Sequence, residues 1–220
     1  MKYKSEDKFQ EFIAKVVSLY YHQKVKFFAI VGGIIAAIVI VIIALTSSGK
    51  ENPEVQLRFT EALGVYSMGN YEQAQELFTN FTRRFGSHYL SAKAHFYLAN
   101  IHYQNQEYDQ ARREFERAYG KLKKNPILGP ASLLGIGNCY EETQNYKKAA
   151  EIYEKVYKRY PKSDLGAEAL LAAGRCYLNL NNLEQAKRIY QKAVKELPPG
   201  ETAEQAKFQL AYINGLQNKF

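Results

Sequence analysis

The chain has 220 residues, of which 46% are hydrophobic and 24% are charged, and its formal net charge is +8. This composition excludes a chain too short or too polar to bury a core, and it allows one folded domain plus an additional segment. Residues 1–26 carry six lysines against three acidic residues, a balance of +3 that leaves +5 for the remainder. The basic excess of the folded part is therefore mild.

Residues 1–26 are expected to form an amphipathic leader in the cytoplasm. Apolar residues recur within it at helical spacing, at Phe9, Phe12, Ile13, Val16, Val17 and Tyr20. Two interpretations stay open: a helix that lies on the membrane surface, or the first turns of one long helix that continues into the bilayer.

Residues 27–46 are expected to form a transmembrane helix. From Phe27 to Leu45 the sequence is an uninterrupted apolar run of 19 residues, roughly 28 Å of helix against a hydrocarbon core of about 30 Å. A cleaved signal peptide is the alternative, but this run is longer than the usual apolar segment of about 7 to 15 residues. Small residues four apart predict a face that packs against another transmembrane helix, at Ala29, Gly33 and Ala37.

The placement of basic residues predicts the orientation of this span. Four lysines lie within about twenty residues before it, and two basic residues lie within a similar distance after it, namely Lys8, Lys15, Lys24 and Lys26 before and Lys50 and Arg58 after. The N-terminus is therefore expected in the cytoplasm. After a linker at residues 47–53, the rest of the chain would lie on the other side, which in a bacterium is the periplasmic side of the inner membrane.

The stretch from Leu133 to Pro161 predicts a helical hairpin. Two amphipathic patterns, at residues 133–143 and 146–160, are joined by a short polar turn. Gly137 and Ala149 are expected where the two helices cross, because residues with almost no side chain let the backbones approach closely. Pro161 cannot continue the second helix.

The same pattern of residues recurs along the chain. Each residue of the series Leu170, Gly174, Tyr177, Ala186, Tyr190, Ala193 and Pro198 lies 37 residues after its counterpart in the hairpin. An upstream series lies 38 residues before it, at His95, Ala99, His102, Tyr108, Ala111, Phe115 and Ala118. The first copy is recognisable at Ala62, Tyr71, Ala74, Phe78 and Phe81. The sequence therefore predicts four repeats.

This arrangement of small and aromatic residues with a terminal proline resembles the tetratricopeptide repeat family. The resemblance implies an all-α fold in which four helical hairpins at residues 54–202 stack into a solenoid. A capping helix at residues 203–220 would cover the end of the stack. The chain departs from the family pattern in two ways: its period is about 37 residues rather than about 34, and Leu133 and Leu170 stand where the family has a leading tryptophan.

No pattern in the chain predicts catalysis, a metal or a cofactor. His88, His95 and His102 lie seven residues apart, which on a helix is about 10.5 Å and too far for two of them to bind one metal ion. Cys139 and Cys176 occupy equivalent positions in consecutive repeats and are expected to be buried free thiols, although a disulfide stays open in an oxidising compartment. We expect a protein that is not an enzyme and has no small-molecule substrate.

The resemblance implies that the first helices of the hairpins line a concave groove that binds proteins or peptides. The groove-facing positions would be Phe59, Leu63, Tyr66, Phe96, Asn100, Tyr103, Leu134, Asn138, Glu141, Leu171, Arg175, Leu178, Phe208 and Tyr212. Such an apolar, aromatic groove suits an extended or helical peptide. The alternative is that some of these aromatic residues pack against one another.

Two other surfaces bear on the choice of partner. The two-carboxylate clamp of chaperone-binding repeats needs lysines at groove-facing positions, and the positions named above include none, so recognition of an acidic C-terminus is not expected. A basic run on a second helix is either a solvated face or a surface attracted to anionic lipid headgroups, and nucleic acid is not expected on that side of the membrane. The run comprises Arg112, Arg113, Arg117, Lys121, Lys123 and Lys124.

The layout of a short leader, one span and long-period repeats resembles the YfgM-like ancillary subunits of the bacterial Sec translocon. That resemblance implies a chaperone or adaptor that works on envelope proteins as they emerge from the translocon. A scaffold for cell-envelope assembly, resembling the repeat proteins of Tol-Pal or outer-membrane assembly systems, is the alternative.

Overall fold

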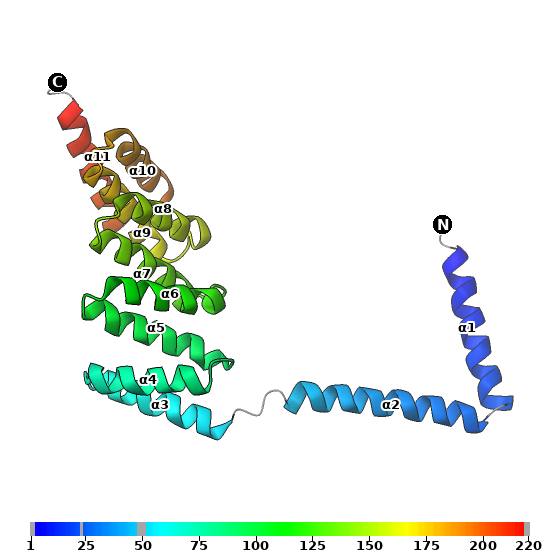
Figure 1. Cartoon of the computed structure of the whole chain (residues 1–220). Helices are drawn as coiled ribbons and strands as arrows, with labels where there is room; N and C mark the ends of the chain where they lie inside the picture. The colour runs from blue at the N-terminus through cyan, green and yellow to red at the C-terminus, as the bar shows by residue number, and fades with distance from the viewer. Residues whose placement is uncertain (1–2, 23, 48–51, 218–220) are drawn as a thin grey trace. The chain divides into compact units, whose positions relative to one another are not determined.

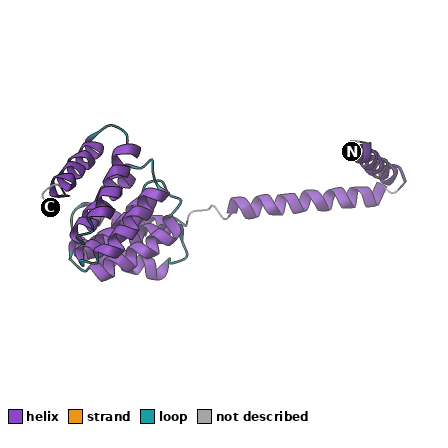
Figure 2. Ribbon diagram, turned by 90° about the horizontal axis from the view of Figure 1, so that it is seen from above, coloured by secondary structure: helices purple, strands orange, loops and turns teal. Residues whose placement is uncertain are grey.

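In a computed structural model of the chain, the structure describes residues 3–22, 24–47 and 52–217. The chain divides into two units, residues 1–52 and residues 53–220. In the described part of the chain, regular secondary structure consists of eleven α-helices and no strands (Figures 1 and 2). The expected all-α fold is confirmed.

The first unit contains α1 (Tyr3–His22) and α2 (Lys24–Ser47). The segment Lys24–Ile42 of α2 is long and apolar enough to cross a membrane, and none of it is buried inside the chain. These are criteria of length and composition, and a signal sequence near an N-terminus satisfies them as well. Ala29, Gly33 and Ala37 are exposed on α2, and a Cβ added at Gly33 would have open space around it.

The second unit is a stack of helical hairpins closed by one more helix (Figure 1). Its helices are α3 (Pro53–Ser67), α4 (Tyr71–Arg84), α5 (Tyr89–Gln104), α6 (Tyr108–Leu122), α7 (Leu128–Glu142), α8 (Tyr146–Arg159), α9 (Asp164–Asn179), α10 (Leu183–Glu196) and α11 (Glu201–Gln217). The four hairpins are α3 with α4, α5 with α6, α7 with α8, and α9 with α10. Buried residues of α11, Ala203, Ala206 and Ile213, join the core of the last hairpins.

The turn inside each hairpin has the same backbone geometry in all four repeats. One residue of each turn has a positive φ, at Gly69 (81°), Gln106 (62°), Gln144 (57°) and Asn181 (53°). In the third hairpin, the N–H of Gln144 donates to the carbonyl of Glu141 and the N–H of Asn145 donates to the carbonyl of Tyr140, both at 2.8 Å. These paired bonds satisfy carbonyls that the end of a helix would otherwise leave unpaired.

The first and second helices of a hairpin meet where a small residue contacts an aromatic ring. A Cβ added to Gly137 would lie 2.5 Å from Cε1 of Tyr153, and a Cβ added to Gly174 would lie 2.5 Å from Cζ of Tyr190. The two pairs are 37 residues apart, as the sequence pattern predicts. Only a residue without a side chain allows this approach between α7 and α8 and between α9 and α10.

Candidate functional site

Three neighbouring hollows lie along the first helices of the second, third and fourth hairpins. The apolar hollow, of about 220 Å³, is lined by Phe96, Asn100, Tyr103, Phe115, Ala131, Leu134, Gly135, Asn138 and Leu165. The acidic hollow, of about 480 Å³, is lined by Tyr103, Asn138, Glu141, Glu142, Gln144, Tyr146, Glu168, Arg175 and Asn179. The terminal hollow, of about 540 Å³, is lined by Leu171, Arg175, Leu178, Tyr190, Glu201, Glu204, Gln205, Phe208 and Gln209.

Shared residues join the three hollows into one surface, which we call the groove. Tyr103 and Asn138 belong to both the apolar and the acidic hollow. Arg175 belongs to both the acidic and the terminal hollow. A chain segment lying along the groove could therefore contact α5, α7, α9 and α11 in turn.

Glu141 is the centre of a hydrogen-bond network in the acidic hollow. The Arg175 guanidinium donates two bonds to its carboxylate, at 2.8 and 2.9 Å. The hydroxyl of Tyr153 lies 2.7 Å from Oε2 of Glu141 and 2.8 Å from Oδ1 of Asn138. Burial raises the pKa of Glu141, but the bonds from Arg175 and Tyr153 outweigh it, so that this pKa lies below its ordinary value. The Glu141 carboxylate is therefore ionised at neutral pH and already paired.

The other carboxylates of the acidic hollow are less engaged. The hydroxyl of Tyr103 donates to Oε1 of Glu142 at 3.0 Å, and burial together with this bond raises the pKa of Tyr103. Within residues 52–217, no side chain forms a hydrogen bond or ion pair with Glu168. Both Glu142 and Glu168 are exposed. They can therefore accept bonds from a ligand without losing a partner inside the protein.

The structure brings most of the expected groove residues together. Phe96, Asn100, Tyr103, Leu134 and Asn138 all line the apolar hollow. A second set lines the terminal hollow, namely Leu171, Arg175, Leu178 and Phe208. Tyr212 is 55% exposed on α11 but lines none of the three hollows.

The first hairpin does not contribute to the groove. Phe59 is only 7% exposed, and its ring packs against Phe78 and Phe81 at centroid distances of 6.0 and 5.6 Å. Tyr66 packs against the ring of Tyr97 at 5.0 Å, and Leu63 lies against the same core. Placing Phe59 on a groove surface is therefore incorrect, because its ring is buried in the core that this hairpin shares with α5.

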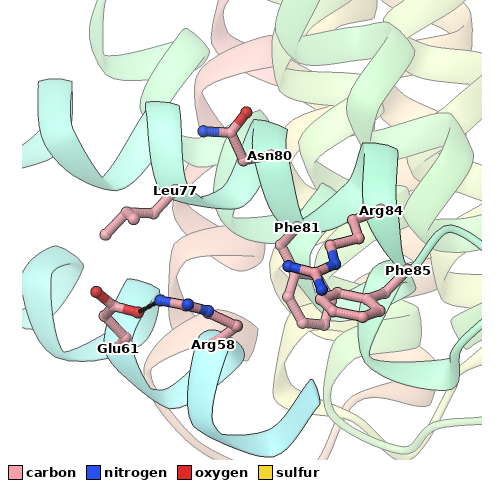
Figure 3. Close-up of a pocket in the computed structure, with 7 residues that line it drawn as sticks. All are labelled: Arg58, Glu61, Leu77, Asn80, Phe81, Arg84 and Phe85. Carbon is pink, nitrogen blue, oxygen red and sulfur yellow. Dashed lines mark hydrogen bonds and ion pairs between the residues drawn. The ribbon is translucent and has the colours of Figure 1, made fainter. Parts of the chain in front are cut away.

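A separate pocket of about 220 Å³ lies on the first hairpin, between α3 and α4 (Figure 3). Its charged side chains are paired: Arg58 with Glu61 at 3.1 Å, and Arg84 with Glu54 at 2.8 Å. Figure 3 shows Arg84 beside the ring of Phe85, with its guanidinium carbon 5.2 Å from the ring centroid. The charged side chains at this pocket are therefore already paired within the protein, and its other walls are largely apolar.

The surroundings of the thiols and histidines in the repeats fit a structural role. Cys139 and Cys176 are buried and unpaired, and burial raises the pKa of each thiol to about 12, so both are protonated at neutral pH. Nδ1 of His95 lies 2.6 Å from Oε2 of Glu114. Within the part of the chain that the structure describes, no three histidine, cysteine or acidic side chains form a group that could hold a metal ion.

Comparisons with known proteins agree with this architecture. Two family models, both described as tetratricopeptide repeat, match residues 59–126 and residues 130–195, which together are more than half of the chain. No curated protein sequence matches the chain.

Solved structures show the same fold at low sequence identity. The TPR-like repeats of a kinesin light chain from Podosopora anserina are 16% identical, with a TM-score of 0.58 over 77% of this chain and 91% of that one. Yeast Tom70 is 18% identical, with a TM-score of 0.58 over 76% of this chain and 34% of that one. The apo form of RapI is 13% identical, with a TM-score of 0.65 over 82% of this chain and 54% of that one. Repeats of this kind are scaffolds for protein–protein interaction, and the chain belongs to the tetratricopeptide repeat family.

Proposed function

We propose that the chain is a membrane-anchored adaptor or chaperone that binds segments of other proteins in its groove. In this proposal, α2 holds the chain in the bacterial inner membrane and the repeats lie on the periplasmic side. The partners are envelope proteins that emerge from the Sec translocon. The apolar span and the excess of lysines before it support the anchor and its orientation.

The main support for this proposal is that the three hollows are continuous. Aromatic and aliphatic side chains lie in both outer hollows, in the terminal one beside charged and amide groups, while polar groups predominate in the middle one. This combination suits a peptide whose side chains enter apolar hollows while polar groups fix its register. The described groove residues offer no paired nucleophile and base, and we propose a binding role rather than a catalytic one.

Site-specific photocrosslinking in intact bacterial membranes tests the proposed role. A photoreactive amino acid is placed at Tyr103, Leu178 or Phe208, all of which line the groove. Met68, which is 84% exposed in the turn of the first hairpin, is the matched control position. We expect the three groove positions, and not position 68, to crosslink to newly synthesised chains and to translocon subunits.

Other crosslinking results would change the conclusion. A fixed set of envelope-assembly proteins at the groove positions would favour the scaffold over the chaperone. No crosslink at the groove above the level at position 68 would contradict binding in the groove altogether.

The proposed topology is tested separately by protease access. Protease added to spheroplasts should digest the repeats and leave a membrane-protected N-terminal fragment. In inverted vesicles the repeats should be protected. The reverse pattern would contradict the periplasmic location, and release of the repeats from washed membranes would identify α2 as a removed signal sequence.

We also propose that Ala29, Gly33 and Ala37 pack against a transmembrane helix of a partner. Gly33→Ile would fill the space in which the second helix lies. The expected result is loss of copurification with the membrane partner, with unchanged membrane insertion. Unchanged copurification would contradict this contact face.

A further inference from the structure

We infer that the groove selects protein segments in which a large apolar side chain lies two residues from a lysine or arginine. This inference deepens the proposed function and rests on it. It concerns the chemistry of the bound segment, which the apolar walls alone do not specify. Charge complementarity between the groove and the segment provides the selection.

The groove has the opposite charge to the rest of the chain. Its three hollows contain five carboxylates and one guanidinium, a formal charge of −4, whereas the whole chain carries +8. Basic residues instead crowd the second helices, such as the exposed Lys147, Lys155 and Lys158 of α8. A cationic segment is therefore attracted to the groove and repelled by these second helices.

Two carboxylates of the acidic hollow are free enough to receive a cation, whereas Glu201 of the terminal hollow accepts an amide bond from Gln205 at 3.2 Å. Glu141 is held by Arg175, and Glu204 is 2.7 Å from Lys207. Glu142 interacts with the uncharged hydroxyls of Tyr103 and Tyr108, and Glu168 has no bonding partner among residues 52–217. The seat for a lysine or arginine is therefore the part of the acidic hollow formed by Glu142 and Glu168.

The apolar hollow lies directly beside this seat. Phe96 and Leu134 provide its apolar wall, and Tyr103 belongs to both hollows. In an extended peptide, side chains two residues apart point to the same side and are separated by about 7 Å. An apolar residue and a lysine or arginine two positions away, in either direction along the peptide, can therefore fill both hollows at once.

A peptide selection tests this inference on the full chain. The protein is held in nanodiscs of zwitterionic phosphatidylcholine, so that basic peptides are not attracted to the lipid. A phage-displayed library of random twelve-residue peptides is selected at low salt, and empty nanodiscs give the background. Sequencing then measures how far each residue pair is enriched over the starting library.

Two charge-neutralised variants make the selection specific. Glu142→Gln with Glu168→Gln removes the proposed seat, and both side chains are exposed, so the fold should be retained. Glu72→Gln with Glu76→Gln removes the same charge from exposed positions on α4 of the first hairpin. Circular dichroism checks that both variants keep the helical content of the unmodified chain.

We expect the unmodified chain and the α4 variant to enrich apolar residues that lie two positions from a lysine or arginine, by about fivefold for two exposed ion pairs. The Glu142 and Glu168 variant should lose the enrichment of basic residues and keep that of apolar residues. Raising the salt concentration should have the same effect as this variant.

Results that contradict this inference can be distinguished from results that contradict the proposed function. Apolar peptides without basic residues, selected by the unmodified chain, would overturn this inference and leave the proposed function standing. If the Glu142 and Glu168 variant still enriches basic residues, these two carboxylates do not form the site for the basic side chain. Peptides that match the basic leader of this chain would identify a second copy as the occupant and overturn a partner protein. No enrichment above empty nanodiscs would overturn both proposals.

Discussion

Gly137 of α7 lies directly against the ring of Tyr153 on α8, so closely that a Cβ at position 137 would come within 2.5 Å of the ring. The Tyr153 ring cannot easily yield, because it is 1% exposed and its hydroxyl is held near Glu141 and Asn138. The contact that packs this hairpin thus also positions two polar residues of the groove. Packing and the candidate site are coupled at this point.

This contact predicts that Gly137→Ala destabilises the repeats. The added methyl group overpacks a filled interior, which costs about 1–3 kcal/mol. Because the Tyr153 ring is fixed, we expect this cost to exceed the gain in helix propensity of about 1 kcal/mol, so the free energy of unfolding should fall. Gly120→Ala on α6 is the matched control, since a Cβ there meets nothing within 4 Å, and it should be stabilising. Urea unfolding of the full chain in detergent, followed by circular dichroism, measures both. Equal effects of the two substitutions would contradict the packing argument.

The repeated turn geometry predicts a reciprocal pair of substitutions. Gln144 has a φ of 57° at the position where the first hairpin has Gly69. Because glycine adopts this conformation without strain, Gln144→Gly should stabilise the chain by about 0.5–1 kcal/mol. Gly69→Gln should destabilise it by a similar amount. Thermal unfolding curves compare the two, and shifts of the same sign would show that φ does not decide the effect.

The ion pair between Glu141 and Arg175 predicts a stability difference that depends on pH. Folding lowers the pKa of Glu141 below the ordinary value of about 4.3. Its contribution is therefore fully present above the unfolded pKa and is lost as the pH falls through the folded pKa. Glu141→Gln should lower the free energy of unfolding by about 1–3 kcal/mol at pH 7, and the gap from the unmodified chain should shrink at pH 3. Urea unfolding at both pH values measures it, and a constant gap would contradict the ionised pair.

The terminal hollow predicts a binding defect without a folding defect. Phe208 is 70% exposed and lines this hollow, so Phe208→Ser should leave the melting temperature nearly unchanged. Loss of its apolar contact should weaken the binding of selected apolar peptides roughly tenfold. Ile127→Ser is the matched control, because Ile127 is 72% exposed and lies in none of the three hollows. Fluorescence anisotropy with a selected peptide distinguishes them, and equal affinities would exclude Phe208 from the site.

The sequence predicts the hairpins well because their packing depends on residue size. The spacing of Gly137 and Tyr153 recurs at Gly174 and Tyr190, and the structure brings both pairs into contact. The common turn is not visible in the sequence, since Gly69, Gln106, Gln144 and Asn181 have little in common as side chains. Their shared geometry comes from backbone hydrogen bonds at the helix ends.

The candidate site is less accessible to sequence analysis than the fold. The helical period places Phe96, Leu134 and Leu171 on one line, but it also places Phe59 there, which is buried in the core between the first hairpin and α5. The sequence analysis does not predict the negative charge of the groove, for a different reason. Glu142 and Glu168 come from different helices, and only the stacking of α7 on α9 brings them to one hollow.

The first hairpin shares a hydrophobic cluster with α5, which reaches from Val55 to Ile101, whereas the main cluster reaches from Ala99 to Ile213. The lining of the three hollows begins at Phe96 and includes no residue of α3 or α4. A pulling force that arrives through the N-terminal side of the repeats acts on α3 first. Because the same cluster contains Leu90, Leu98 and Ile101 of α5, tension on the two outermost helices is passed to the helix that carries part of the apolar hollow.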